Sequence, residues 1–400
     1  MLSGESLSDR KLSRLELALL TIATAVVTAN GYYIHPIIAR IAEDFQASAS
    51  LIGMVPALNQ LALALGIFLL LPLGDRFSNR RLISFFVAGQ CAGITIMAFA
   101  ADVYWFAAGS TVLGFFTIAP YLLPSYASKR VDPGQIGHVT ALLTTGIVMG
   151  ILLARSGAGV IGEYLGWRAV YYLGAALMLI TVFLLPLIMD EDDKPRDTKP
   201  ALSYSALLMS IGPVISRNPE VLVSGAIQGL SFGLFLSIWL ALSLHLTSPA
   251  MGYGVDVVGY LSLLAIFNLY ATPRLGRLAE RIGARTARLA FSVLQALGLL
   301  LMFPCGQSIW LLTIPLLIPN SLCPTLDNSG RMLYLSEEPT IRTRLMTVYI
   351  ILMFLGGGMG SWLGPTLYAW GGWNANATLA LGAALMTVAL SLYALRKYEN

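Results

Sequence analysis

The chain contains twelve apolar segments, each long enough to cross a lipid bilayer. We place them at 15–39, 50–72, 82–101, 104–126, 139–161, 168–189, 220–246, 257–273, 287–305, 309–326, 345–368 and 375–395. Charged residues make up only 12% of the 400 residues, whereas soluble domains average about 25%, so the chain could not coat a soluble core of this size. The sequence therefore predicts an all-α polytopic membrane protein with twelve transmembrane helices and a lipid bilayer as its solvent.

Lysine and arginine are distributed unevenly between the two sides of these spans. If the N-terminus is cytoplasmic, all of the 25 lysines and arginines except Arg40, Arg155 and Arg168 fall in cytoplasmic segments. Because cytoplasmic loops carry an excess of these residues, we expect a multi-pass protein of the cell membrane with both termini cytoplasmic. The first span is too long for a signal-peptide core and has no small-residue cleavage site after it, so we expect it to be mature structure.

Several classes of function are disfavoured. The net charge of +4 is small and evenly scattered, so we expect no nucleic-acid partner. The three cysteines, Cys91, Cys305 and Cys323, lie inside apolar stretches, which favours neither a disulfide framework nor a metal site. The chain shows no paired nucleophile and base, no metal-binding motif and no phosphate-binding loop. We expect no catalytic residues, no metal and no cofactor.

The longest polar stretch, around residues 190–202, separates two sets of six spans. We expect an N-terminal six-helix bundle over 1–189, a cytoplasmic linker with a short amphipathic helix over 190–218, and a C-terminal six-helix bundle over 219–400. Short motifs recur between the two sets at separations of 205 to 208 residues, as internal repeats in transporters do. They are Leu73–Arg80 with Leu278–Arg285, Gly166-Trp167 with Gly372-Trp373, and Leu173–Met178 with Leu381–Met386.

Twelve spans in two sets, with an acidic and basic motif after spans two and eight, resemble the major facilitator superfamily. The family signature is G-x-x-x-D-R-x-G-R-R, and the second copy matches it with Gly276, Glu280, Arg281, Gly283 and Arg285. The first copy keeps Asp75, Arg76, Arg80 and Arg81, but has Leu71 and Ser78 at the two glycine places. The resemblance implies two pseudo-symmetric six-helix bundles that carry a small-molecule substrate, and we expect a monomer.

Two further stretches are similar to the drug:proton antiporter-like and arabinose-efflux-permease-like branch of that superfamily. They run from Gly146 to Arg168 and from Arg342 to Ser361. This similarity implies secondary active efflux of a drug, metabolite or secondary metabolite, coupled to protons. The chain departs from the branch at Ser110, where those proteins carry an arginine, and at Ile151, where they carry a proline. Import or facilitation of a small anionic or neutral solute, and a non-transporting receptor or structural role, are the alternatives.

The signature motif suggests a latch on the cytoplasmic side. Span eleven begins near Arg344, so the positive end of its helix dipole lies at that side, where Asp75 can accept from it. Basic residues of both copies then pair with local acids and hold the two bundles together. The predicted latch comprises Asp75, Arg76, Arg80, Glu280, Arg281, Arg285 and Arg344.

Arg155 lies about 24 Å into the fifth span and is the costliest residue to place in a bilayer. It either faces a substrate cavity or has a structural role, in which it extends outward to the membrane surface or pairs with another group. Among the 21 acids only Asp327 falls in or near a span, at the inner end of span ten, so it and His35 are the possible proton sites. The alternative for His35 is a hydrogen-bonded interfacial histidine before Pro36. One deep cation without a deep acid predicts a preference for neutral or anionic solutes over lipophilic cations.

Uncharged polar groups inside the spans each need a partner, and some are expected to line a central substrate cavity while others join helices. Together with Arg155, the cavity candidates are Asn30, Tyr33, Asn59, Gln60, Tyr121, Gln228, Asn268, Asn320 and Tyr349.

Overall fold

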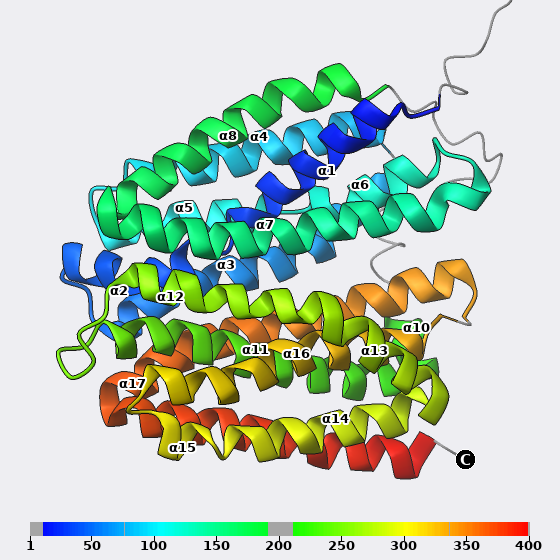
Figure 1. The fold of residues 1–400 in the computed structure, drawn as a ribbon. Helices are drawn as coiled ribbons and strands as arrows, with labels where there is room; N and C mark the ends of the chain where they lie inside the picture. The colour runs from blue at the N-terminus through cyan, green and yellow to red at the C-terminus, as the bar shows by residue number, and fades with distance from the viewer. Residues whose placement is uncertain (1–10, 76, 191–210, 336, 399–400) are drawn as a thin grey trace, which may run out of the picture.

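The structure is a computed structural model that describes residues 11–75, 77–190, 211–335 and 337–398. In these ranges all regular elements are helices, and there are no strands. Eleven helical stretches are long and apolar enough to cross a membrane, and the last of them, Ile341–Tyr398, joins two helices at a kink. The described residues thus contain the twelve predicted spans. They form two bundles that lie side by side, which confirms the predicted fold class (Figure 1).

The first bundle holds the first six spans. Its elements are α1 (Arg14–Ala29), α2 (Ile34–Asp44), α3 (Ala49–Leu70), η2 (Leu71–Asp75), α4 (Asn79–Ala98), α5 (Val103–Phe116), α6 (Ala119–Ser128), η3 (Pro133–Gln135), α7 (Ile136–Tyr164) and α8 (Trp167–Ile188). Span one combines α1 with α2, and span four combines α5 with α6.

The second bundle holds spans seven to twelve. Its elements are α11 (Glu220–Leu246), α12 (Val255–Ser262), η4 (Leu263–Ile266), α13 (Phe267–Ile282), α14 (Ala284–Leu299), α15 (Met302–Cys305), α16 (Ile309–Met332) and α17 (Pro339–Tyr398). The eighth span was expected to end at residue 273, but α13 continues to Ile282, so the arginines of the second motif copy extend the helix instead of forming a loop. The predicted linker, 190–218, contains α10 (Ile211–Arg217), and residues 191–210 of it lie outside the described ranges.

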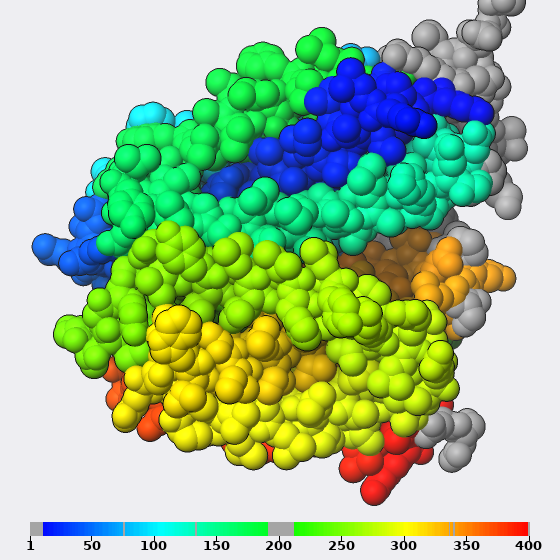
Figure 2. Space-filling view, viewed as in Figure 1, coloured from blue at the N-terminus to red at the C-terminus, as the bar shows by residue number. Residues whose placement is uncertain are grey.

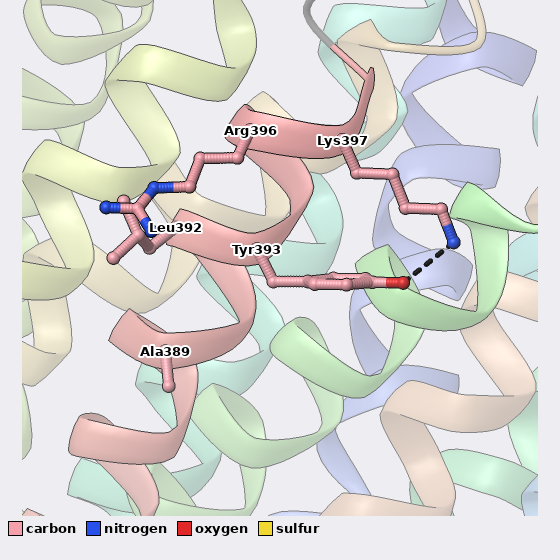
Figure 3. Close-up of a pocket in the computed structure, with 5 residues that line it drawn as sticks. All are labelled: Ala389, Leu392, Tyr393, Arg396 and Lys397. Carbon is pink, nitrogen blue, oxygen red and sulfur yellow. Dashed lines mark hydrogen bonds between the residues drawn. The ribbon is translucent and has the colours of Figure 1, made fainter.

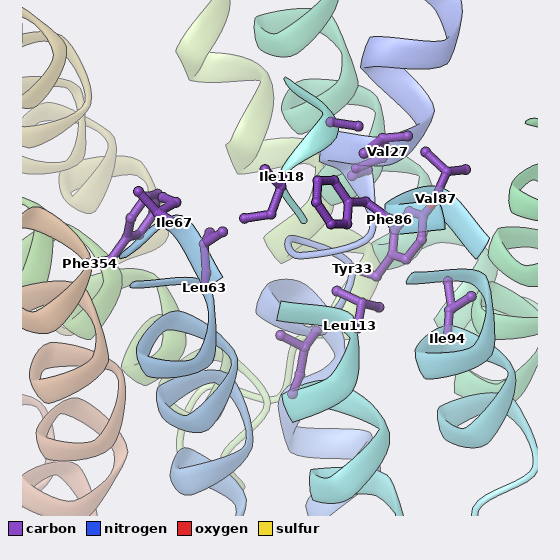
Figure 4. Close-up of a cluster of buried hydrophobic side chains, with 14 of the residues drawn as sticks. Val27, Tyr33, Leu63, Ile67, Phe86, Val87, Ile94, Leu113, Ile118 and Phe354 are labelled. Atoms are coloured by element: carbon purple, nitrogen blue, oxygen red, sulfur yellow. The ribbon is translucent and has the colours of Figure 1, made fainter. Parts of the chain in front are cut away.

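The start of α1 and the end of α17 lie at the same end of the molecule, which we call the terminal end (Figure 1). The loops between α2 and α3 and between α11 and α12 lie at the other end, which we call the opposite end. A large cluster of buried apolar side chains crosses from one bundle to the other. In it, Leu63 and Ile67 of α3 lie beside Phe354 of α17, so span two and span eleven share one core (Figure 4).

The repeated Gly-Trp motif has the same conformation in both bundles. Gly166 and Gly372 have φ values of 85° and 64°, a region that favours glycine, and each turns the chain into the next span. The tryptophans that follow are both 6% exposed, and both donate through Nε1: Trp167 to Asp44 Oδ2 at 3.2 Å and Trp373 to the Met302 carbonyl at 2.9 Å. The repeat read from the sequence therefore corresponds to a repeated corner.

The two copies of the signature motif differ at one glycine place for a visible reason. Gly283, in the second copy, has a φ of 89° and connects α13 directly to α14. Ser78 takes the equivalent place in the first copy with φ −63°, and its side chain caps α4 by accepting from the Arg81 amide at 3.4 Å. A serine N-cap thus replaces a glycine turn at the start of the third span.

Side-chain amides, one buried and one half-buried, join spans within each bundle in a matched way. Asn59 of α3 donates to the Ser110 carbonyl at 2.8 Å, and Asn268 of α13 donates to the Asn320 carbonyl at 2.8 Å. These bonds connect span two to span four and span eight to span ten. The internal repeat therefore includes a polar tie, and each bundle carries its own.

We expect Asn59→Ala and Asn268→Ala each to lower the free energy of unfolding by about 1 kcal/mol and the melting temperature by roughly 2 °C. The two sites lie in different bundles, so the double variant should show the sum. Differential scanning fluorimetry in lipid nanodiscs measures this, with the exposed Asn374→Ala in α17 as the control. A double variant that melts like the wild type would show that these two hydrogen bonds do not stabilise the fold.

Candidate functional site

The two bundles are joined near the opposite end. Ser243 Oγ of α11 donates to the Pro36 carbonyl of α2 at 2.6 Å, and the Val255 amide donates to Glu163 Oε2 at 2.9 Å. At the same end the Trp362 indole donates to Ser50 Oγ at 3.2 Å. These bonds link helices of one bundle to helices of the other, so this end is closed.

Two glycines let the backbones of α7 and α12 touch at that closure. A Cβ placed on Gly159 would lie 2.7 Å from the Cα of Gly259 and 2.8 Å from the Val255 carbonyl oxygen. Toward the terminal end, by contrast, the surface is hollowed between the bundles, and orange atoms of α17 are visible at the bottom of the recess (Figure 2). The molecule is thus closed at one end and hollowed at the other.

Arg155 of α7 lies between the two bundles, about 28 Å along its helix from the terminal end. Its side chain does not extend to a membrane surface, since the residue is 3% exposed. Nη2 lies 2.9 Å from Nδ1 of His35, which is itself fully buried. Of the structural alternatives for Arg155, extension outward is not observed, whereas the guanidinium does contact another buried side chain, that of His35.

Three aromatic rings surround the guanidinium. Its Cζ lies 5.2 Å from the ring centroid of Tyr32, 5.0 Å from that of Phe235 and 4.9 Å from that of Trp239. Such distances allow cation–π attraction. Tyr32 belongs to the first bundle, whereas Phe235 and Trp239 are on α11 of the second. We call Tyr32, His35, Phe235 and Trp239 the Arg155 cage.

The first span is broken beside this cage. Residues 30–33 form turns between α1 and α2, with the Tyr32 amide bonded to the Ala29 carbonyl at 2.9 Å. Pro36, one turn later, lacks the amide that would continue the helical hydrogen bonds. Broken helices of this kind are tolerated in a bilayer where they border a protein interior or cavity.

Several buried polar atoms near the middle of the bundles have no hydrogen-bond partner among the described residues. In the cage they are Arg155 Nε and His35 Nε2. Among the other cavity candidates they are both side-chain polar atoms of Asn30, Oε1 of Gln60, Oε1 of Gln228 and Nδ2 of Asn320. Burying such atoms unpaired is costly, so they are the atoms of this region that a polar ligand could satisfy.

The remaining cavity candidates have internal partners or other positions. Asn59 and Asn268 are the polar ties described above, and Asn320 also accepts from the Trp239 indole at 3.3 Å. Tyr33 packs edge-on against Tyr171 inside the first bundle. The Tyr349 hydroxyl donates to the Asp327 carbonyl at 3.2 Å, while Tyr121 is half-buried on α6.

The charged groups around the cage are paired elsewhere. At the opposite end Arg40 pairs with Glu163 at 3.0 Å, and Arg168 pairs with Asp44 at 2.6 Å. Asp327, the acid nearest a span centre, pairs with Arg331 one turn later on α16 at 2.9 Å. Within the described residues no carboxylate pairs with Arg155.

The predicted latch residues lie at the terminal end. Arg285 makes two bonds to Glu220, at 2.8 and 2.7 Å, which join α14 to α11 within one bundle. Glu280 and Arg281 are exposed in the last turn of α13, and Arg80 and Arg344 are half-buried at the starts of α4 and α17. Arg76 and the side chain of Asp75 lie outside the described residues, so the contact proposed for Asp75 stays a prediction.

A separate surface pocket lies at the C-terminal end of α17 (Figure 3). It is lined by Ala389, Leu392, Tyr393, Arg396 and Lys397, and Lys397 Nζ donates to the Tyr393 hydroxyl at 2.7 Å. None of the predicted site residues lines it. The pocket is part of the basic surface at the terminal end and not of the space between the bundles.

Sequence reasoning missed three of the four cage residues. Phe235 and Trp239 are four residues apart on α11, so they share one helix face, but an aromatic pair at that spacing is equally typical of lipid contact or core packing. Tyr32 adjoins the predicted Tyr33, and only the break before Pro36 turns it toward Arg155. The available signal was the unpaired arginine, which requires some partner in the adjacent span.

Comparisons with known proteins agree with this architecture. The model of the Major Facilitator Superfamily matches residues 20–325. The chain belongs to the major facilitator superfamily. It is therefore a membrane transporter of small molecules, and the predicted family is confirmed.

The relatives are bacterial transporters. An uncharacterized transporter, YgaY, from Escherichia coli O157:H7 is 28% identical over 93% of this chain and 95% of its own length. A probable transporter from Streptomyces coelicolor is 27% identical over 92% of this chain and 86% of its own length. The multidrug resistance protein MdtG of Klebsiella pneumoniae is 22% identical over 81% of this chain and 79% of its own length.

Solved structures share the fold. The nucleoside transporter NupG has a TM-score of 0.76 at 16% identity, and the match covers 96% of this chain and 100% of the NupG chain. A bacterial homologue of the human lysosomal transporter Spinster, in an inward-facing and occupied conformation, has a TM-score of 0.75 at 16% identity, with coverage of 96% and 97%.

Proposed function

We propose that the chain is a secondary active transporter that exports a small organic molecule by alternating access. The observation that carries this proposal is the position of Arg155, buried between a closed end and a hollowed end and contacted by both bundles. Rocking of the bundles would open the closed end and bring this region to the other side of the membrane. The similarity to a multidrug resistance protein supports export over import.

The positive-inside distribution supports a bacterial cell-membrane location with the terminal end cytoplasmic. In that orientation the described conformation is open toward the cytoplasm, the side from which an exporter loads. A C-terminal green fluorescent protein fusion should then fluoresce, whereas an alkaline phosphatase fusion at the same place should be inactive. The reverse pattern would invert the topology and with it the loading side.

The signature motif would control closure of the cytoplasmic side. When the bundles close there, Asp75 would meet the start of α17 near Arg344, and the arginines of both copies would pair with local acids. Asp75→Asn should therefore leave the terminal end more accessible to maleimide labelling. Equal labelling of the two proteins, with equal transport, would remove Asp75 from the latch.

Protons are the proposed coupling ion, with His35 and Asp327 as the candidate carriers. His35 bonds to Arg155 between the bundles, and Asp327 lies on α16 beside Arg331. His35→Gln and Asp327→Asn distinguish them, because loss of the true carrier abolishes pH-driven accumulation while solute exchange without a gradient continues. Unchanged accumulation by both variants would move the coupling to another group or ion.

Flux through purified protein tests the proposal as a whole. Proteoliposomes of defined orientation are given a panel of labelled acids, amines and neutral solutes, with and without a pH gradient. We expect at least one solute to move from the terminal-end side outward, faster with protons flowing in the opposite direction. Movement only in the other direction would make the protein an importer, and no movement of any solute would favour a receptor or structural role.

A further inference from the structure

We propose that Arg155 anchors the carboxylate of the transported solute and that the Arg155 cage selects small carboxylates with an aromatic or otherwise apolar body. This inference rests on the proposed transport function, because it assigns a substrate class to the same region between the bundles. In this region the Arg155 guanidinium contacts the His35 imidazole and three aromatic rings, which come from both bundles.

The first argument is charge balance. A guanidinium keeps its charge in proteins, and this one is 3% exposed with no carboxylate partner among the described residues. Glu163, on the same helix as Arg155, pairs with Arg40; Asp44 of α2 pairs with Arg168, and Asp327 of α16 pairs with Arg331. His35 is a neutral or cationic partner, so it cannot supply the missing negative charge. A buried cation in this situation attracts an anion strongly, because the surroundings have a low dielectric constant.

The second argument is the supply of free donors. Among the described residues, neither Arg155 Nε nor Nδ2 of Asn30, which lies in the turn that precedes the cage, has a hydrogen-bond partner. A carboxylate has two oxygens and accepts from a guanidinium with favourable geometry. Asn30 Nδ2 is a further donor beside the break in the first span. Since no carboxylate of the described residues pairs with Arg155, these donors fit a carboxylate better than a cation.

The third argument concerns the broken first span. α2 begins at Ile34, and His35 in its first turn contacts the guanidinium through its ring. The start of a half-helix therefore lies close to Arg155, and half-helix starts in transporters of several folds meet anionic groups. This position at a helix break adds to the case for an anion.

The fourth argument gives the shape of the ligand. The rings of Tyr32, Phe235 and Trp239 lie over the guanidinium, with centroids 4.9 to 5.2 Å from its Cζ. A small hydrophilic acid would leave these rings facing its hydroxyl groups. An aromatic carboxylate instead places its charged end on Arg155 and its ring against the cage.

Binding of three probes that share a naphthalene ring and differ in the charge of one small substituent tests the inference, with the full-length protein in lipid nanodiscs. The probes are naphthalene-2-carboxylate, naphthalene-2-carboxamide and (2-naphthylmethyl)ammonium, measured by isothermal titration calorimetry. We expect the carboxylate to bind at least about tenfold more tightly than the carboxamide and the ammonium to bind most weakly, in line with a charge-assisted bond. Arg155→Gln should abolish this preference, and Arg155→Lys should retain part of it.

The matched control is Arg40→Gln, which removes the same charge from the opposite end but leaves the cage intact. It should keep the wild-type order of the probes. Each variant is compared with the wild type by melting temperature and by size-exclusion profile, so that loss of folding is recognised. If wild-type protein binds the carboxamide or the ammonium as tightly as the carboxylate, the inference is wrong, whatever the variants do.

The outcome also separates this inference from the proposed function. Selective carboxylate binding without flux of any solute in proteoliposomes would support the anion site and contradict the proposed export. Flux of amines or neutral solutes, without a preference for the carboxylate probe, would support transport and contradict the anion site.

Discussion

Replacing Gly159 by leucine is expected to hold the opposite end open and to reduce net transport by about tenfold or more. A tenfold loss corresponds to a destabilisation of the closed conformation by about 1.4 kcal/mol. A Cβ at Gly159 would lie 2.7 Å from the Gly259 Cα and 2.8 Å from the Val255 carbonyl oxygen, and backbone atoms cannot move aside as a flexible side chain can. The bundles can then close at the terminal end but not at the opposite end. Flux in proteoliposomes measures the loss.

Gly157→Leu on the same helix is the matched control, since a Cβ there meets nothing within 4 Å. If the leucine side chain keeps the opposite end open, buried residues there should become accessible to labelling. A cysteine at Ser243, which is fully buried at the closed end, should react with an impermeant maleimide added to the opposite end in the Gly159→Leu background and not in the control. Full transport by Gly159→Leu would mean that the α7–α12 contact plays no part in the cycle.

Replacing Gly360 by leucine is expected to lower the free energy of unfolding by about 3 kcal/mol or more, which exceeds ordinary overpacking. Gly360 and Gly356 of α17 lie against the backbone of Gly233 and Gly229 of α11, and a Cβ on either α17 glycine would overlap that backbone. Spans seven and eleven would have to separate along their whole contact. Membrane yield and the melting temperature in nanodiscs measure the effect.

Gly382→Leu is the control for this variant. It places the same side chain on α17 at a position where a Cβ meets nothing within 4 Å. The control should express and melt like the wild type. If Gly360→Leu melts within about 1 °C of the control, the close approach of α11 and α17 does not contribute to stability.

Much of the fold follows from the sequence for simple reasons. Bilayer thickness fixes the length of each span, so apolar run length alone located the spans, including 220–246 to the residue. The Gly-Trp repeat could be recognised because a positive φ restricts the choice of residue. The extent of α13 could not be read, because its last nine residues are largely charged and small, and a helix outside the apolar layer has no hydropathy signal.

The candidate site was less predictable. The cost of burying a charge identified Arg155, but whether it extends outward or turns inward depends on helix rotation, which packing decides. The polar residues Asn59 and Asn268 looked like cavity residues, since a polar side chain in a span signals the need for a partner but not which partner. Phe235 and Trp239 carried no distinguishing signal, because aromatic residues occur equally on lipid-facing and internal surfaces.

The contact of Arg155 with the second bundle has a mechanical consequence. Phe235 and Trp239 offer the guanidinium flat ring faces at 5.0 and 4.9 Å, and cation–π attraction of about 0.5–2 kcal/mol each falls off gradually when a cation slides across a face. A directional bond would have to break before one bundle could turn past the other. The ring faces instead let the guanidinium slide, so this contact adds little to the activation barrier for rotation beyond that of the directional bonds near the opposite end.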